Sequence, residues 1–135
     1  NGEKMSKSKG NTINVFLPEK KLRKQIMGIA TDSTPLEAPK NPSTCTVFKL
    51  YQLVASSEQQ ATMKQHYEQG GYGYGHAKQA FFECLLATFT EERKAFDYYM
   101  SHPDEVEKTL QLGAQKAKSV AQNVLNRVRE KLGFS

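Results

Sequence analysis

The sequence predicts a mainly α fold, a helical bundle with a long C-terminal helix. Two observations carry this prediction: apolar residues recur every three or four positions in several segments, and no segment shows a strong strand pattern. A chain of 135 residues, of which 38% are hydrophobic and 24% charged, is long enough to bury one core. No apolar stretch approaches the roughly 18 residues that a membrane helix needs, so neither a membrane-spanning nor a disordered protein is expected.

The first third of the chain predicts one helix between two irregular segments. Residues 1–14 are polar and indicate an exposed loop. Pro18 suits the first turn of a helix that ends near Ala30. Its apolar positions follow helical spacing: Leu22, Ile26 and Ile29. Residues 31–43 hold three prolines and no apolar pattern, which predicts a long connector.

The middle of the chain predicts further helices separated by glycine. A short apolar face comes first, made of Phe48, Tyr51, Leu53 and Val54. Ser57 and, three residues later, Gln60 have the spacing of a capping box, which predicts a helix through about Glu68. The glycines of residues 70–75 end this helix, because glycine adopts a left-handed backbone at little cost. Another helix is expected over residues 76–100.

The last predicted helix, from Pro103 to about Leu132, has the clearest pattern. Acidic residues occupy its first turns and basic residues its last turns, which complements the helix dipole at both ends. Its apolar face consists of Val106, Leu110, Gly113, Ala117, Val120, Ala121, Val124, Val128 and Leu132. The small residues in this face would let a neighbouring element approach closely.

Cysteine and histidine spacing gives no sign of a metal site or a disulfide framework. Cys45 and Cys84 have no CxxC or CxH neighbour, and the three histidines lack metal-ligand spacing. Free cysteines are typical of a reducing cytosol. The chain begins with Asn1 instead of methionine and shows no signal-peptide pattern, so we expect a piece of a longer protein.

Positive charge is concentrated at the front of the chain. Residues 1–28 hold seven basic and two acidic residues, whereas residues 29–135 hold twelve of each, and the net charge is +5. A basic N-terminal segment before a neutral remainder indicates an anionic partner that binds first to this segment: a phosphate, a nucleotide or a nucleic acid.

One short motif in this basic N-terminal segment carries the candidate chemistry. Lys4, Met5, Ser6, Lys7 and Ser8 combine flexible cations with hydroxyl donors, a composition that suits phosphate oxygens. The motif is not a P-loop, because no GxxxxGK[ST] pattern precedes a helix. By composition alone, a solvated basic tail is the favoured interpretation.

The order of these residues resembles the KMSKS signature of class I aminoacyl-tRNA synthetases, letter for letter, and Asn11 falls where that group often has asparagine. The remaining chain resembles the C-terminal portion of bacterial-type tryptophanyl-tRNA synthetases. The similar blocks are Thr31-Asp32-Ser33, Tyr74-Gly75-His76-Ala77-Lys78 and Gly113-Ala114-Gln115-Lys116-Ala117. Lys9-Gly10-Asn11 departs from the common tryptophan form towards the leucine, methionine or cysteine enzymes, so the signature alone does not fix the amino acid.

The resemblance implies a C-terminal fragment that begins at the KMSKS loop. Residues 1–15 would be a remnant of a Rossmann-type catalytic domain, and residues 16–135 a helical tRNA-binding domain with the long helix over about 103–132. It implies a cytoplasmic ligase that joins tryptophan to ATP, with Mg²⁺, and transfers the aminoacyl group to tRNA(Trp). Members of this family form homodimers, largely through parts of the catalytic domain that this sequence does not contain. For the fragment alone, a monomer therefore stays an open alternative. Without the upstream amino-acid pocket, we expect the fragment alone to be inactive.

The resemblance also assigns residue roles. Lys7 would be the catalytic lysine that contacts the ATP phosphates, and Lys4, Met5, Ser6 and Ser8 would shape the ATP-binding loop. In the last helix, Lys116, Lys118 and Gln122 are candidates for tRNA contacts, with a solvated charged face as an equal alternative. A different class of function stays open as the alternative: a non-catalytic RNA-binding or protein-interaction helical module with a basic N-terminal tail.

Overall fold

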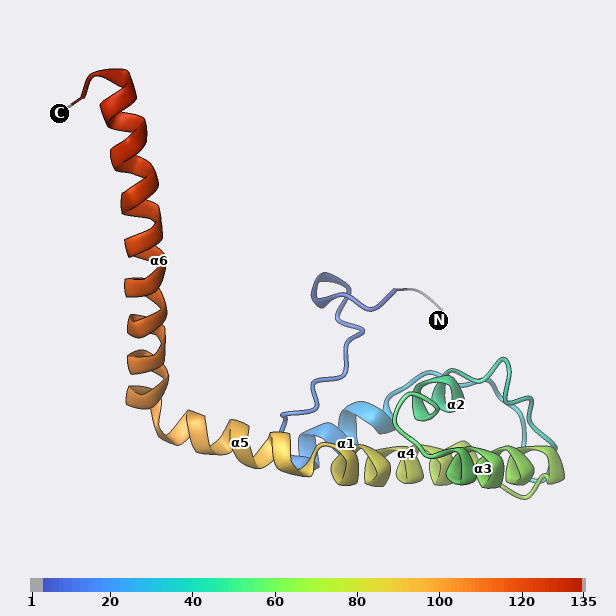
Figure 1. Ribbon diagram of the computed structural model, residues 1–135. Helices are drawn as coiled ribbons and strands as arrows, with labels where there is room; N and C mark the ends of the chain where they lie inside the picture. Colours follow the sequence, from blue (N-terminus) through green and yellow to red (C-terminus); the bar gives the residue numbers. More distant parts are fainter. Residues whose placement is uncertain (1–3, 135) are drawn as a thin grey trace. The chain divides into compact units, whose positions relative to one another are not determined.

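The computed structural model describes residues 4–134, and these residues form helices and connecting loops without a strand (Figure 1). Residues 1–3 of the predicted 1–15 remnant lie outside the described residues. In chain order the elements are the 3₁₀ turn η1 (Lys7–Lys9) and the helices α1 (Glu19–Met27), α2 (Thr46–Tyr51), α3 (Ser57–Gln69), α4 (Tyr74–Thr88), α5 (Thr90–Ser101) and α6 (Pro103–Leu132). The predicted mainly α fold is therefore confirmed. None of the described helices has the length and apolarity to cross a membrane.

The chain divides into two compact units, residues 1–93 and 94–135. The core lies in the first unit, where α4 packs against both α1 and α2. The largest side chains of this core that have almost no exposure are Leu22 and Ile26 of α1, Val47 of α2 and Tyr67 of α3. Both cysteines, Cys45 and Cys84, are free and buried there, and the Cys45 thiol lies 3.4 Å from the Tyr67 hydroxyl.

Helix α3 begins at a capping box that is one residue earlier than the predicted Ser57–Gln60 pair. Ser56 Oγ accepts from the Gln59 amide at 3.2 Å, and Gln59 Oε1 accepts from the Ser56 amide at 2.8 Å. Gln60 instead donates to the carbonyl oxygens of Gln52 and Ala55, so it ties the preceding turn to the helix. The predicted pair was wrong because Ser56 and Ser57 are adjacent, as are Gln59 and Gln60, so both pairs have the same spacing.

Helix α1 is shorter than predicted, and the predicted helix over residues 76–100 is two helices. Pro18 is the N-cap residue of α1, and the helix ends at Met27. α4 and α5 are separated at Phe89, whose backbone leaves the helical region at φ −104°. The Thr90 hydroxyl donates back to a carbonyl of the preceding turn at 2.7 Å, a local bond that competes with helical geometry.

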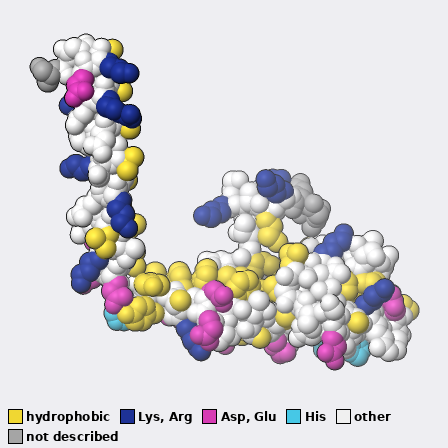
Figure 2. Space-filling model, in the orientation of Figure 1, with side chains coloured by type: hydrophobic (Ala, Val, Ile, Leu, Met, Phe, Trp, Pro, Cys, Tyr) yellow, Lys and Arg dark blue, Asp and Glu magenta, His cyan; other side chains and the backbone are white. Residues whose placement is uncertain are grey.

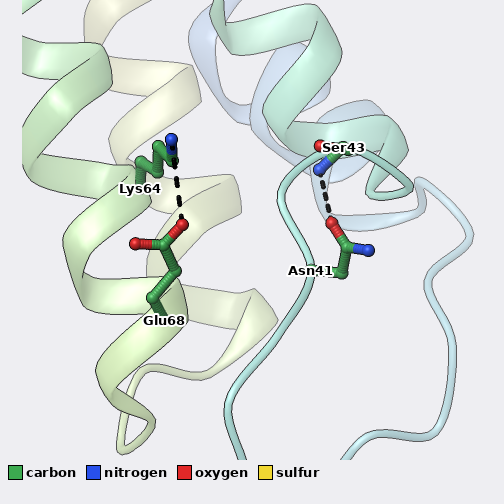
Figure 3. Close-up of polar contacts among 4 residues, drawn as sticks. All are labelled: Asn41, Ser43, Lys64 and Glu68. Atoms are coloured by element: carbon green, nitrogen blue, oxygen red, sulfur yellow. Dashed lines mark hydrogen bonds and ion pairs between the residues drawn. The ribbon is translucent and has the colours of Figure 1, made fainter.

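The connector before α2 is ordered by side chains. Asn41 Oδ1 accepts from the Ser43 amide at 2.9 Å, which forms an Asx turn (Figure 3). Lys40 is only 4% exposed, and its ammonium group donates to the carbonyl oxygens of Pro35, Leu36 and Ala38 at 2.9, 3.2 and 3.1 Å. By contrast, Lys64 and Glu68 form an exposed ion pair on α3 at 3.8 Å, drawn in the same figure.

Helix α6 has the predicted bounds and an αL glycine at its C-terminal end. Gly133, at φ 78°, donates to the carbonyl of Glu130, and Phe134 donates to that of Arg129. No residue of α6 is buried, and Figure 2 shows hydrophobic and basic side chains open to solvent along it. The apolar stripe therefore has no cover among the described residues.

Candidate functional site

Within the KMSKS segment, the side chain of Asn11 links the ends of the loop. The backbone amide of Ser6 donates to Asn11 Oδ1 at 2.8 Å, and Asn11 Nδ2 donates to the carbonyl of Lys4 at 3.4 Å. These two bonds close residues 4–11 into one loop. The asparagine that the resemblance singled out is thus a loop-closing residue.

Inside this loop the chain makes one turn of 3₁₀ helix, where the sequence predicted an irregular segment. Ser6 Oγ caps the turn by accepting from the Lys9 amide at 3.3 Å, and it lies 3.2 Å from Ser8 Oγ. Gly10 closes the turn with φ 63° and donates to the Lys7 carbonyl at 3.2 Å. The left-handed backbone at this position explains the glycine.

The lysines of the loop are open to solvent, and a cavity lies beside it. The side chains of Lys4 and Lys7 are exposed, so their ammonium groups are accessible to an anion. The cavity of about 330 Å³ is lined by Met5 and Asn11 of the loop, by Gln25 of α1 and by Lys49 of α2, among others. Lys49 was not predicted, because its approach to the loop depends on the packing of α2.

The segment that follows, residues 12–17, is bound to the helical body, and we call it the strap. Gln25 Nε2 donates to the Thr12 carbonyl at 2.7 Å, and Gln25 Oε1 accepts from the Asn14 amide at 3.2 Å. Arg93 Nη1 donates to the carbonyls of two further strap residues, to that of Leu17 at 3.0 Å and to that of Val15. Neither Gln25 nor Arg93 was a candidate from the sequence, since Arg93 lies far along the chain from the strap.

Two of the three similar sequence blocks meet in the first unit. The Tyr74 hydroxyl donates to Asp32 Oδ1 at 2.8 Å, and the Thr34 amide donates to the same oxygen at 2.9 Å. Hydrogen bonds from Thr34, and then from Tyr74, lower the pKa of the Asp32 carboxyl. Burial, and next the bond to Asp32, raises the pKa of Tyr74 to about 12. Lys78 of the second block donates to the carbonyl of Met27 at the end of α1, at 3.1 Å.

The tRNA candidates of α6 do not form one cluster. Lys116, Lys118 and Gln122 are all exposed. Lys118 and Gln122 are four residues apart and share a face, whereas Lys116 and Lys118 are two residues apart and point about 200° from one another around the helix. Gln122 Nε2 donates to Asn126 Oδ1 at 2.9 Å on the same face. The helix thus brings Lys118 and Gln122 together and leaves Lys116 on another side.

No family model matches the chain, but curated relatives match nearly all of it. The tryptophan–tRNA ligase of Campylobacter jejuni strain RM1221 is 41% identical over 133 residues, and that of Rhodopirellula baltica is 43% identical over the same length. Each comparison covers 98% of this chain and 42% of the relative. The chain therefore spans about two fifths of the length of the curated relatives that it matches.

Solved structures agree with these matches. A crystal structure of tryptophanyl-tRNA synthetase from Campylobacter jejuni superposes with a TM-score of 0.93 at 42% identity, covering 98% of this chain and 43% of that one. A second structure from the same organism, described as complexed with ADP and tryptophan, gives a TM-score of 0.93 at 41% identity over 98% of this chain and 42% of that one. At 41 to 42% identity over 98% of the chain, the similarity covers both the fold and the overall sequence.

Proposed function

We propose, from the premise that this chain is homologous to the tryptophan–tRNA ligases over 98% of its length, that it works as the C-terminal part of such a ligase. The enzyme would activate tryptophan with ATP to the aminoacyl-adenylate and transfer the aminoacyl group to tRNA(Trp). The observation that carries the proposal is the complete KMSKS signature at Lys4 to Ser8, held as a closed loop with exposed lysines. The alternative of a non-catalytic binding module has no such support, because the matched relatives are ligases.

In this proposal Lys7 acts on the leaving pyrophosphate. A carboxylate oxygen of tryptophan attacks the α-phosphorus of ATP, the bond to the bridging oxygen breaks, and negative charge grows on the pyrophosphate. An ammonium group on a flexible stem can donate hydrogen bonds to those oxygens as the charge develops. Lys4 and the hydroxyls of Ser6 and Ser8 would bind the same phosphates, and Met5 would shape the loop. Mg²⁺ would enter with ATP and neutralise part of the phosphate charge.

Residues of α6, which follows the loop in the sequence, would bind the tRNA. Lys118 and Gln122 share one face of α6, which offers an ammonium group and an amide to phosphates and to exposed base edges. Lys116 would contact the tRNA from a different face. We further propose a cytoplasmic ligase that is a homodimer in its complete form, while the chain alone has no ligase activity.

The catalytic assignment is tested in a chimeric ligase, in which this chain replaces the matching segment of the Campylobacter jejuni ligase. Tryptophan-dependent exchange of pyrophosphate into ATP is the assay. Lys7→Ala should slow the exchange by roughly 10²-fold to 10³-fold, by analogy with the loss of one preorganised donor. Lys64→Ala, on the surface of α3, is the matched control and should leave the rate unchanged. An equal rate for Lys7→Ala and the unmodified chimera would refute the proposed role.

The tRNA assignment is tested by separate charge reversals. If Lys118 contacts a phosphate, Lys118→Glu should weaken tRNA(Trp) binding and reduce the slope of log affinity against log salt by about one. Lys116→Glu reports on the other face in the same way. Unchanged affinity and unchanged slope for both variants would assign these lysines to the solvated surface.

A further inference from the structure

The strap is a short irregular segment that ends in a turn over residues 14–17, and side chains of the helices bind it. Its alternate residues Ile13, Val15 and Leu17 are partly buried and pack against the core. Three strap amides are also satisfied: those of Asn14, Phe16 and Leu17 donate to Gln25 Oε1, to the Asn14 side chain and to the Asn14 carbonyl. The strap is therefore part of the folded first unit, although its sequence reads as a loop.

Two polar side chains fasten the strap at separate points. Gln25, half-buried on α1, binds both a carbonyl and an amide near the start of the strap, at 2.7 and 3.2 Å. Arg93, half-buried on α5, binds two carbonyls near its end through one nitrogen, Nη1. A hydrogen bond from a charged donor in a partly buried place is stronger than one between neutral groups. A segment held at both ends in this way cannot act as a free hinge.

The loop in front of the strap is closed upon itself by Asn11, as described above, and its base, where it joins the strap, is residue 12. The orientation of that base decides where the Lys7 ammonium lies. Since Gln25 and Arg93 hold the strap, they influence the loop through this base.

We propose that Arg93 and Gln25 are positioning residues that hold the base of the KMSKS loop, so that Lys7 meets the ATP phosphates in the correct place. The inference rests on the proposed ligase function. Both act through the strap, which joins the loop at residue 12. Loss of either fastening should leave the fold intact and reduce the effect of Lys7 on the reaction.

The first test uses the 135-residue chain and follows amide hydrogen exchange. Arg93→Met should speed exchange at Phe16 and Leu17 about tenfold or more, because both hydrogen bonds from the guanidinium group to the strap carbonyls are lost. Exchange at core positions of α4, such as Phe81, should not change. Arg23→Met is the matched control, because the hydrogen bond of Arg23 goes to Gln79 on α4 and not to the strap. Equal exchange in the strap of Arg93→Met and of the control would overturn the proposal.

The second test measures pyrophosphate exchange in the chimeric ligase. Arg93→Met should lower kcat about tenfold with the KM for tryptophan unchanged, and Arg93→Lys should recover part of the loss. In a Lys7→Ala background, Arg93→Met should change kcat by less than about twofold, because a residue that acts through Lys7 has nothing left to position. Independent, multiplying losses in the two backgrounds would show that Arg93 does not act through the loop.

The two tests separate failure of this inference from failure of the proposed function. If Lys7→Ala leaves the chimeric ligase fully active, the proposed function fails, and the positioning role that depends on it fails as well. If Lys7→Ala abolishes exchange while Arg93→Met behaves like the Arg23→Met control in both assays, the function stands and the positioning role is refuted.

Discussion

Replacing Lys40 with methionine tests whether a buried cation organises the connector. Lys40 is 4% exposed, and its ammonium group donates to three backbone carbonyls at 2.9, 3.1 and 3.2 Å. It also lies 5.5 Å from the centre of the Tyr74 ring. Methionine has a similar length and an apolar tip, so it keeps the packing of the stem and removes all three hydrogen bonds.

The expected loss follows from these contacts. Each hydrogen bond from a charged group contributes about 1.5 to 3 kcal/mol, but burying the ammonium costs several kcal/mol. Two of the three carbonyls, those of Pro35 and Leu36, belong to exposed residues and can bind water once the lysine is gone. We therefore expect Lys40→Met to lower the free energy of unfolding by about 2 to 3 kcal/mol. In a unit of this size that corresponds to a Tm lower by roughly 10 to 20 °C.

The assay is urea and thermal unfolding of the 135-residue chain, followed by circular dichroism. Lys64→Met is the matched control, since the exposed pair with Glu68 should contribute at most about 0.5 kcal/mol. A loss for Lys40→Met no larger than that of the control would refute the reasoning. It would mean that the desolvation of the ammonium cancels its hydrogen bonds.

Three further predictions concern local geometry and pH. Gly70→Ala should destabilise the chain by roughly 1 to 3 kcal/mol in urea unfolding, because φ is 79° and a Cβ would lie 2.3 Å from the Glu37 carbonyl oxygen; a neutral effect would contradict this. Ser56→Ala should lower the free energy of unfolding by about 1 kcal/mol and Ser57→Ala by clearly less. A larger loss for Ser57→Ala would instead support the Ser57–Gln60 capping box predicted from the sequence. Tyr74, whose pKa is raised to about 12 from an ordinary value near 10, holds its proton more tightly when folded, so its contribution to stability is complete below pH 10 and is lost as the pH rises towards 12. Tyr74→Phe should therefore show a shallower fall of unfolding free energy over pH 10 to 12, and an unchanged slope would count against the shift.

Elements with strong local signals could be predicted from the sequence. The bounds of α6 were correct because Pro103, the charge order and a long apolar repeat all agree. The capping box of α3 was misplaced by one residue, and the break at Phe89 was missed, because threonines on both sides give only weak signals against a helix. The predicted exposed loop of residues 1–14 includes the first strap residues, because the three alternating apolar residues of the strap are too few to indicate that it packs against the core.

In the candidate site, too, some residues could be predicted from the sequence and others could not. The signature itself is a contiguous motif, so Lys4 to Ser8 could be named from the sequence, and their roles stay predictions. What holds the signature could not be named: Arg93 reaches the strap from 78 residues away, and a buried lysine such as Lys40 looks like any surface lysine in a sequence. Contacts between distant residues depend on packing, which no local pattern contains.

The two core thiols give the first unit a built-in reporter. Cys45 and Cys84 are 7% and 8% exposed, and both lie in that unit. A thiol-specific dye can therefore modify the chain only when this core opens. The unit that carries α6 adds no labelling of its own, since neither cysteine lies in it. The rate of labelling would thus measure how often the core of the first unit opens, without a signal from the second unit.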